Sequence, residues 1–170
     1  RTGMDAKASV SDNLLLGKQR TPEFSVLGIH LRRGRARKYA EELSERFDIR
    51  AAGVEEPAGS LSGGNMQKLL IAREFSFGSR LLVVSQPTRG VDIGAIEFIH
   101  ERIVQKRNEG CAILLISADL DELFRLSDRL VTIFEGRITG SFQAGEIDRQ
   151  EIGFYMTGAR QGEEEAKGGA

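Results

Sequence analysis

Residues 61–68 read LSGGNMQK and place a small hydroxyl side chain and two glycines directly before a run of helix-forming residues. Glycine lets a ligand approach the backbone closely, and the first N–H groups of a helix have no partner within the helix. Together with the positive end of the helix dipole, such a segment can bind a phosphate group. Ser62 can equally be an ordinary N-cap, so this segment alone leaves both interpretations open.

A second polar pair follows an apolar run in residues 82–92, which read LVVSQPTRGVD. Apolar strands that end in this way often deliver carboxylates to a phosphate site, where they hold a metal ion or polarise a water. Here the pair is Ser85 and Gln86, which are both neutral. Ser85 has no charge with which to hold a divalent cation, and Gln86 can orient a water but cannot accept its proton.

A phosphate-cradling loop of the form GxxxxGK[ST] does not occur in the sequence. The only Gly-Lys pair, Gly17-Lys18, is followed by Gln19, and the required earlier glycine position holds Asp12. The sequence begins at Arg1 with no secretory signal pattern, and we expect it to be a piece of a longer protein.

The composition is that of an ordinary globular protein: 170 residues, 40% hydrophobic and 29% charged, enough for one domain with a core or one domain plus a small appendage. A net charge of −1 gives no overall field for nucleic acid or an anionic membrane. The longest apolar runs are far below the roughly 20 residues of a spanning helix. The single cysteine, Cys111, excludes an internal disulfide and suits a reducing compartment. Because His30 and His100 are isolated, we expect no metal cluster.

The apolar spacing predicts helices over residues 9–17, 35–47 and about 65–75, with loop over residues 18–34 and a connector over residues 50–60. From residue 80 the pattern alternates between strand and helix. Strands are predicted at residues 81–84, 112–117 and 129–134, with helices after Asp92 and over residues 119–127, and a tight turn at Glu135-Gly136 into a hairpin edge. The apolar runs favour a parallel sheet buried on both faces. A stripe of isoleucines is expected to bury the helix after Asp92; its members are Ile93, Ile96, Ile99 and Ile103.

The motifs and their order resemble those of ATP-binding cassette (ABC) ATPases over residues 1–157. LSGGNMQK resembles the signature motif, the strand before Ser85 stands where the family has its Walker B motif, PTRGVD resembles the D-loop, and LLISADLDEL stands where the family has its switch histidine. Asn65 after the glycines, PTRGVD and the absent switch histidine resemble the second cassette of the fused sugar-importer ATPases. Gln86 and GVDIGAIEFIH look most similar to the nucleoside-importer branch.

This resemblance implies an α/β fold: part of a P-loop NTPase (RecA-like) core with a parallel sheet, joined to an α-helical subdomain. The Walker A motif and the Q-loop would lie upstream of Arg1. The expected division is a helical subdomain and connector over residues 1–60, the signature helix and C-terminal part of the ATPase core over 61–142, a C-terminal helix over 143–158 and a disordered tail over 159–170.

The resemblance also implies roles for single residues. The family usually has Asp at position 85 and Glu at position 86, and the switch histidine position holds Ala118, so no catalytic residue is intact; an alignment slip of one residue would place Ser117 or Asp119 there. ABC cassettes pair head to tail, so the signature of one contacts ATP bound by the other. The residues expected to contact the partner's ATP are Ser62, Gly63, Gly64, Asn65 and Gln67, and those expected at the dimer seam are Gly90, Val91 and Asp92.

The implied whole is the ATP-hydrolysing subunit of an importer for sugars or nucleosides, which acts with ATP and Mg²⁺, a partner cassette, transmembrane permease subunits and, indirectly, a solute-binding protein. It would be cytoplasmic and peripheral on the inner face of the membrane. This chain alone is expected to be inactive, to hold neither ATP nor metal tightly, and to self-associate through an exposed sheet edge and apolar face.

Two other functions stay open from the sequence: a soluble ABC-type ATPase acting on nucleic acid or the ribosome, and an interaction module that binds no nucleotide. The first would use the basic run HLRRGRARK at residues 30–38. Tyr39 is the only aromatic residue adjacent to that run, and the chain is not basic overall. A solvated helix entrance, or a face near a membrane-embedded partner, is therefore favoured, and no nucleic acid is expected as a partner.

Overall fold

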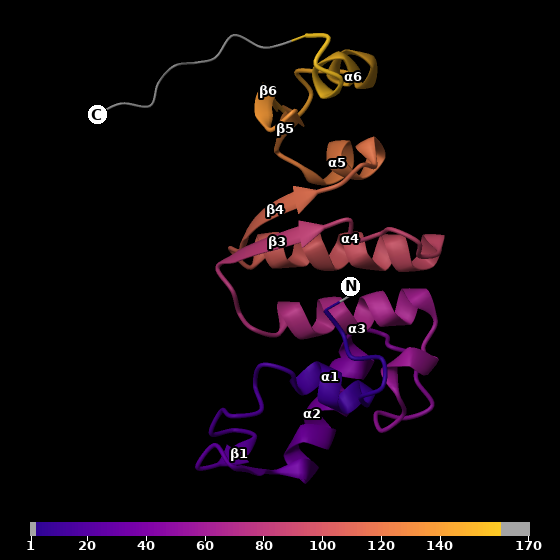
Figure 1. The fold of residues 1–170 in the computed structure, drawn as a ribbon, viewed down its shortest axis with the longest axis vertical. Helices are drawn as coiled ribbons and strands as arrows, with labels where there is room; N and C mark the ends of the chain where they lie inside the picture. Colours follow the sequence, from indigo (N-terminus) through magenta and orange to yellow (C-terminus); the bar gives the residue numbers. More distant parts are fainter. Residues whose placement is uncertain (1–2, 161–170) are drawn as a thin grey trace, which may run out of the picture. The chain divides into compact units, whose positions relative to one another are not determined.

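The computed structural model describes residues 3–160, which form two compact units, residues 3–114 and 115–160 (Figure 1). Most of the predicted C-terminal tail lies outside the described residues. Between residues 3 and 160 we find no helix with the length and apolar character needed to cross a membrane.

Three helices form the helical layer of the first unit: α1 (Val10–Leu15), α2 (Arg33–Arg46) and α3 (Gly63–Phe75). They match the three predicted helices, with α3 beginning two residues earlier than expected. α1 packs against both α2 and α3, and a short 3-10 helix, η1 (Ala58–Ser60), leads into α3. Buried apolar side chains from all three helices form the core between them: Val10, Leu14, Ala36, Ala40, Leu43, Leu69, Ala72 and Phe75.

A small hairpin lies between α1 and α2, where the sequence predicted only loop. Strands β1 (Ser25–Val26) and β2 (His30–Leu31) pair antiparallel. Leu27 and Gly28 make the turn with positive φ angles of 54° and 72°. The loop prediction was wrong here because two-residue strands show no periodicity, and Leu-Gly is not one of the dipeptides that mark such a turn.

A strand, a helix and a second strand come next in the chain: β3 (Leu81–Ser85), α4 (Ile93–Asn108) and β4 (Ala112–Ile116). β3 and β4 are hydrogen-bonded neighbours and their arrows point the same way in Figure 1, as expected for a parallel pair. Asp92 caps α4 as predicted, and Ile99 and Ile103 are buried. Ile93 is 78% exposed, so its place in the predicted stripe was wrong. Ile93 lies six residues before Ile99, and at 3.6 residues per turn this spacing places the two side chains about 120° apart around the helix axis.

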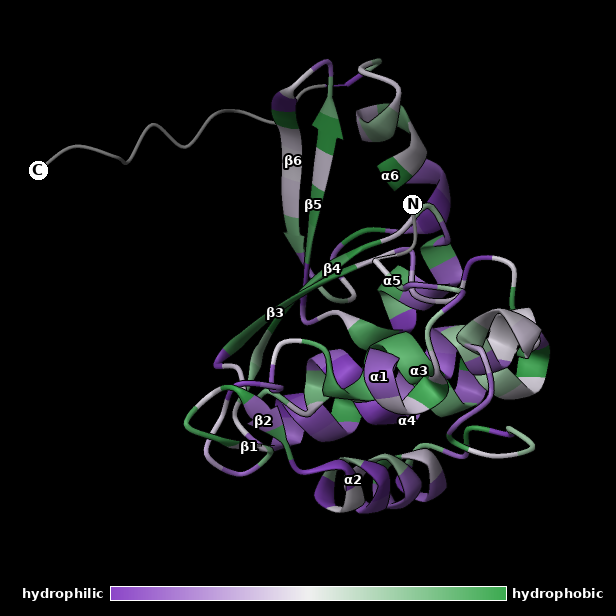
Figure 2. Cartoon of the chain, turned by 60° about the horizontal axis from the view of Figure 1, so that its bottom comes forward, coloured by the Kyte–Doolittle hydropathy of each residue, from purple (hydrophilic) through white to green (hydrophobic). Residues whose placement is uncertain are grey.

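The prediction that these strands are buried on both faces was also wrong for the residues that the structure describes. Apart from Ser85 at the end of β3, both strands are apolar (Figure 2), but alternate side chains are exposed. Leu81 is 60% and Val83 61% exposed, and Leu114 and Ile116 are about half exposed. The sequence shows that these residues are apolar, but it does not show whether a second layer covers them.

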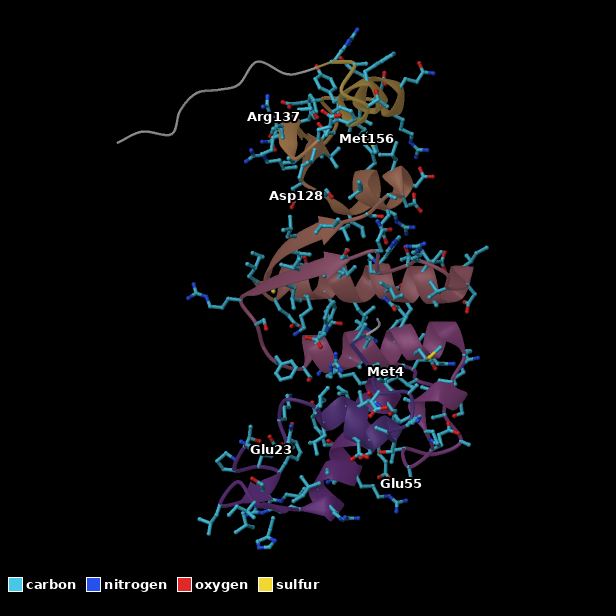
Figure 3. All side chains as sticks on the ribbon, viewed as in Figure 1. Met4, Glu23, Glu55, Asp128, Arg137 and Met156 are labelled. Atoms are coloured by element: carbon cyan, nitrogen blue, oxygen red, sulfur yellow. The ribbon has the colours of Figure 1, made fainter. Side chains whose placement is uncertain are left out.

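The second unit contains α5 (Leu120–Leu126), β5 (Arg129–Phe134), β6 (Arg137–Gln143) and α6 (Arg149–Met156). β5 and β6 pair antiparallel, and Glu135 and Gly136 make the predicted turn between them with positive φ angles. Arg137, labelled in Figure 3, is the first residue of β6 after this turn. α6 packs on β5, and the Phe142 and Tyr155 rings meet edge to face at 4.9 Å. Leu130, Ile147 and Ile152 form the buried core.

Candidate functional site

The start of α3 presents an exposed hydroxyl group. Ser62 is the N-cap of α3, and its Oγ accepts hydrogen bonds from the Asn65 backbone N–H at 3.4 Å and from the Asn65 side-chain Nδ2 at 3.0 Å. Those two bonds use the acceptor capacity of the oxygen, so its own hydrogen is available to donate to a further group. Ser62 and Gly63 are both exposed. The helix therefore offers an O–H donor and unpaired backbone N–H groups at its positive end.

The two glycines let α3 begin against the start of α4. A Cβ on Gly64 would lie 3.1 Å from Asp92 Oδ2 and 3.4 Å from Ala95 Cβ, and one on Gly63 would lie 3.6 Å from the Gly90 carbonyl oxygen. Asp92 itself accepts the Ala95 N–H at 2.9 Å. The structure thus brings together two segments that the sequence singled out, residues 62–64 and residues 90–92.

Asn65 ties the start of α3 to the segment that follows α2. Its Oδ1 accepts the Arg50 backbone N–H at 2.9 Å, while its Nδ2 donates to Ser62. The amide is therefore engaged with its own chain at both ends, which suits a residue that orients the Ser62 hydroxyl. Gln67 is half-buried further along α3.

An ion pair between a buried lysine and an exposed aspartate holds the same segment one turn later. Lys68 is buried and its Nζ lies 2.6 Å from Asp48 Oδ2 and 3.0 Å from the Asp48 carbonyl oxygen. The hydrogen bond from Lys68 lowers the pKa of Asp48 below its ordinary value. The Asp48 backbone has a φ of 47°, a conformation that non-glycine residues rarely adopt. The pair therefore fixes a strained turn between α2 and α3.

Aromatic and cationic side chains extend this contact to α4. The Phe98 ring lies beneath Lys68 Nζ at 4.7 Å and beneath the Arg102 guanidinium at 4.8 Å, and Arg102 also lies over Phe47 at 5.5 Å. Such contacts are worth about 0.5–2 kcal/mol each, more where water is excluded. The sequence does not reveal the Asp48–Lys68 pair, because the two residues lie 20 positions apart and no spacing rule links them. The same holds for Arg102, which donates to the Arg46 carbonyl oxygen 56 positions away.

The end of β3 is built differently. Ser85 is exposed, Gln86 has a φ of 49°, and the Gln86 carbonyl oxygen accepts the Arg89 N–H at 3.3 Å in the turn that follows. Pro87 is fully buried and anchors this turn. Two neutral side chains do not supply the carboxylate oxygens that Mg²⁺ prefers. Throughout residues 3–160, no group of three or more His, Cys, Asp or Glu residues could hold a metal ion.

The predicted switch position lies in the second unit. Ala118 is exposed and has no functional group. Its two neighbours have local structural roles: Ser117 Oγ accepts the Asp119 N–H at 3.0 Å, and Asp119 caps α5 by accepting the N–H groups of Asp121 and Glu122.

Curated relatives match almost the whole chain. It is 45% identical over 158 residues to the nucleoside import ATP-binding protein NupA of Lactococcus lactis subsp. cremoris, covering 93% of this chain and 31% of the relative. The guanosine import ATP-binding protein NupO of Bacillus subtilis is 42% identical, covering 91% of this chain and 30% of the relative. The glucose import ATP-binding protein TsgD13 of Haloferax volcanii is 44% identical, covering 93% and 29%. The chain thus spans about a third of the length of the curated relatives it matches. No family model matches it.

Solved structures share the fold. A dimeric ATP-binding cassette in a post-hydrolysis state, bound to ADP and Pi, superposes with a TM-score of 0.69 at 18% identity, covering 86% of this chain and 61% of that one. A nucleotide-free ATP-binding cassette from an ABC transporter gives a TM-score of 0.68 at 23% identity, covering 89% and 64%. The chain therefore has part of the α/β fold of these cassettes.

Proposed function

Because this chain belongs to the ABC transporter ATP-binding proteins of the nucleoside- and sugar-importer type, and corresponds to part of a cassette, we propose that it works within the ATP-binding subunit of such an importer. Its specific role is to supply phosphate ligands from the start of α3 to ATP bound by a partner cassette. The proposal rests on one observation above all: the exposed Ser62 caps the N-terminus of α3, its Oγ is held by the Asn65 amide, and this helix end lies beside residues 90–92.

The chemistry assigned to this end is electrostatic. The Ser62 hydroxyl and the first N–H groups of α3 donate to phosphate oxygens, and the helix dipole adds to their attraction. Donors fixed in this way stabilise charge that develops on the terminal phosphate during hydrolysis. Asn65 acts as a positioning residue for Ser62, while Gly90, Val91 and Asp92 lie at the seam with the partner cassette.

The end of β3 has the opposite role in this proposal, as the silent side of an asymmetric pair of ATP sites. Gln86 cannot act as the general base, Ser85 does not support Mg²⁺, and Ala118 cannot contact the terminal phosphate. Loss of a general base lowers the rate by about 10²- to 10⁴-fold. Hydrolysis would then depend on ATP and Mg²⁺ held by groups outside this chain.

The assembly that this role requires includes a partner cassette and transmembrane permease subunits, and we propose that the intact subunit lies at the inner face of the membrane. The relatives are named for the import of nucleosides, guanosine and glucose. Sugars and nucleosides are therefore the solute classes that we propose for the importer.

Titration of the isolated chain with a fluorescent ATP analogue tests the division of labour. We expect weak binding, with a Kd well above the micromolar range, and no ATP turnover above a buffer blank. The reason is that hydrogen-bond donors at one helix end do not make a complete ATP site. Submicromolar affinity, or measurable hydrolysis, would contradict the proposal.

A further inference from the structure

The β1–β2 hairpin exposes apolar side chains at its tip. Leu27 is 91% and Ile29 79% exposed, and Val26 and Leu31 are about two-fifths exposed on the adjoining strands. In Figure 1 the hairpin lies at the end of the first unit remote from β3 and β4. Exposed apolar residues scattered singly are normal, but several together on one projecting turn indicate a binding surface.

The residues around this tip are strongly basic, although the whole chain has a net charge of −1. Between residues 18 and 40, seven Lys and Arg residues stand against a single acidic one, Glu23, which Figure 3 labels near the hairpin. Two of the cations, Arg37 and Lys38, pair along α2 with Glu41 and Glu42. The three nearest the hairpin are exposed and have no acidic partner within residues 3–160: Arg32, Arg33 and Arg35.

The backbone at the tip adds a third observation. Leu27 has a φ of 54°, in the left-handed region where Gly or Asn is favoured. A leucine there has strained backbone and gains no burial within the described chain. An outlier of this kind suggests a function at that position.

We propose that the hairpin tip and the start of α2 form a docking surface for an anionic lipid bilayer. Leu27 and Ile29 enter the boundary between headgroups and acyl chains, and the three unpaired arginines contact lipid phosphates. Charge complementarity selects this occupant, because apolar side chains flanked by unpaired cations match an anionic interface better than a neutral or basic protein surface. The inference goes beyond the proposed ATP role and does not depend on it.

The expected strength follows from the two contributions. Each cation near an anionic membrane surface strengthens binding about fivefold, so the three arginines together contribute roughly 100-fold. Burial of two apolar side chains contributes about tenfold or more. Since the electrostatic part is screened within about 10 Å at ordinary salt, binding weakens as salt rises.

Vesicle co-sedimentation of the intact subunit tests this, with vesicles of phosphatidylcholine containing 30% phosphatidylglycerol and vesicles of phosphatidylcholine alone. Wild-type protein is expected to bind the anionic vesicles at least tenfold more tightly than the neutral ones. The double variant Leu27→Asn/Ile29→Ser should weaken anionic binding about tenfold, and Arg32→Gln/Arg33→Gln/Arg35→Gln roughly 100-fold. Both sets of positions are exposed, and Asn suits the backbone at position 27, so the fold should survive.

Matched controls come from exposed positions in the second unit. Ile138→Ser, at a residue 67% exposed, and Arg125→Gln/Arg129→Gln/Arg137→Gln should leave vesicle binding unchanged. Equal binding by wild type and hairpin variants, or equal losses from the controls, would overturn the proposal. The absence of vesicle binding by wild-type protein would also overturn the proposal. If, in that case, a photo-crosslinker at position 27 labels a transmembrane subunit, the hairpin binds a protein partner instead.

Discussion

The start of α3 and the end of β3 lie in the same unit, and each presents polar side chains at the end of a regular element. At α3, Ser62 is exposed and its Oγ accepts two hydrogen bonds from Asn65, which hold the hydroxyl in place. At β3, Ser85 and Gln86 offer neither charge nor a proton acceptor strong enough for hydrolysis. The difference supports the proposed division of roles: the start of α3 offers hydrogen-bond donors suited to a phosphate, whereas the end of β3 has no carboxylate.

The two regions also differ in how firmly they are held. The start of α3 is tied to residues 48–50 by the Asn65 amide and by the Lys68–Asp48 ion pair, and Phe98 packs beneath Lys68. The end of β3 has a left-handed Gln86 and an uncovered apolar face beside it. A segment that must place donors to within a fraction of an ångström benefits from such support, whereas a silent segment does not need it.

Apart from Ser62→Arg, the largest effect on ATP hydrolysis is expected for Gly64→Ala in the intact subunit. The new Cβ would lie 3.1 Å from Asp92 Oδ2 and push α3 away from residues 90–95. The contact requires a shift of a few tenths of an ångström. Because a displacement near 1 Å at a positioned group can cost about 10²-fold in rate, this smaller shift should slow ATP hydrolysis by up to about tenfold. Gly34→Ala is the control, because its Cβ would meet open space. Equal ATP hydrolysis rates for Gly64→Ala and wild type would show that the close contact between the start of α3 and residues 90–95 is not needed for hydrolysis.

A smaller effect is expected for Asp48→Asn, which removes the charge that pairs with buried Lys68. Stability at pH 7 should fall by about 1 kcal/mol, a modest value because half of the Asp48 side chain faces water. Since the pKa of Asp48 is lowered in the folded state, the wild-type advantage is present above the unfolded pKa near 4 and is lost as pH falls through the folded pKa.

Urea denaturation of the chain at pH 7 and at pH 3 measures this difference. The gap between wild type and Asp48→Asn should narrow at the lower pH. Glu41→Gln, which breaks the exposed pair with Arg37, should leave the unfolding midpoint unchanged at both pH values. A pH-independent gap would mean that the Asp48 carboxylate does not act through its charge.

The smallest effect is expected at the end of β3. Gln86→Gly removes a side chain from a backbone with a φ of 49° and should change stability by less than about 1 kcal/mol, because the relief of strain offsets the entropy lost by glycine. Hydrolysis by the intact subunit should stay within about twofold of wild type. A larger drop in the steady-state ATPase rate would show that Gln86 contributes to the chemistry after all.

Local signals in the sequence were enough for most of the fold. Ser9, Ser62, Asp92 and Asp119 each cap the helix that follows, because a short side chain that accepts an N–H group acts within three residues. Motif order singled out residues 62–64 and 90–92 separately, as a signature and a D-loop, but did not predict that they lie side by side. The close approach of Gly64 to Asp92 and Ala95 is a finding of the structure.

Long-range packing could not be predicted in the same way. The Asp48–Lys68 pair spans 20 residues, and the exposure of Val83 depends on whether another layer covers β3. Apolar composition alone does not distinguish a strand buried on both faces from one covered on a single face. The hairpin at residues 25–31 went unseen because each strand has only two residues.

The central claim is that the start of α3 serves ATP hydrolysis and the end of β3 does not. Steady-state hydrolysis by the intact subunit, measured side by side for Ser62→Arg and Gln86→Ala, tests it most directly. We expect a loss of about 10²- to 10³-fold for Ser62→Arg, because a donor is lost and a bulky side chain fills its place. For Gln86→Ala we expect a change below about twofold. Equal losses from the two variants would contradict it.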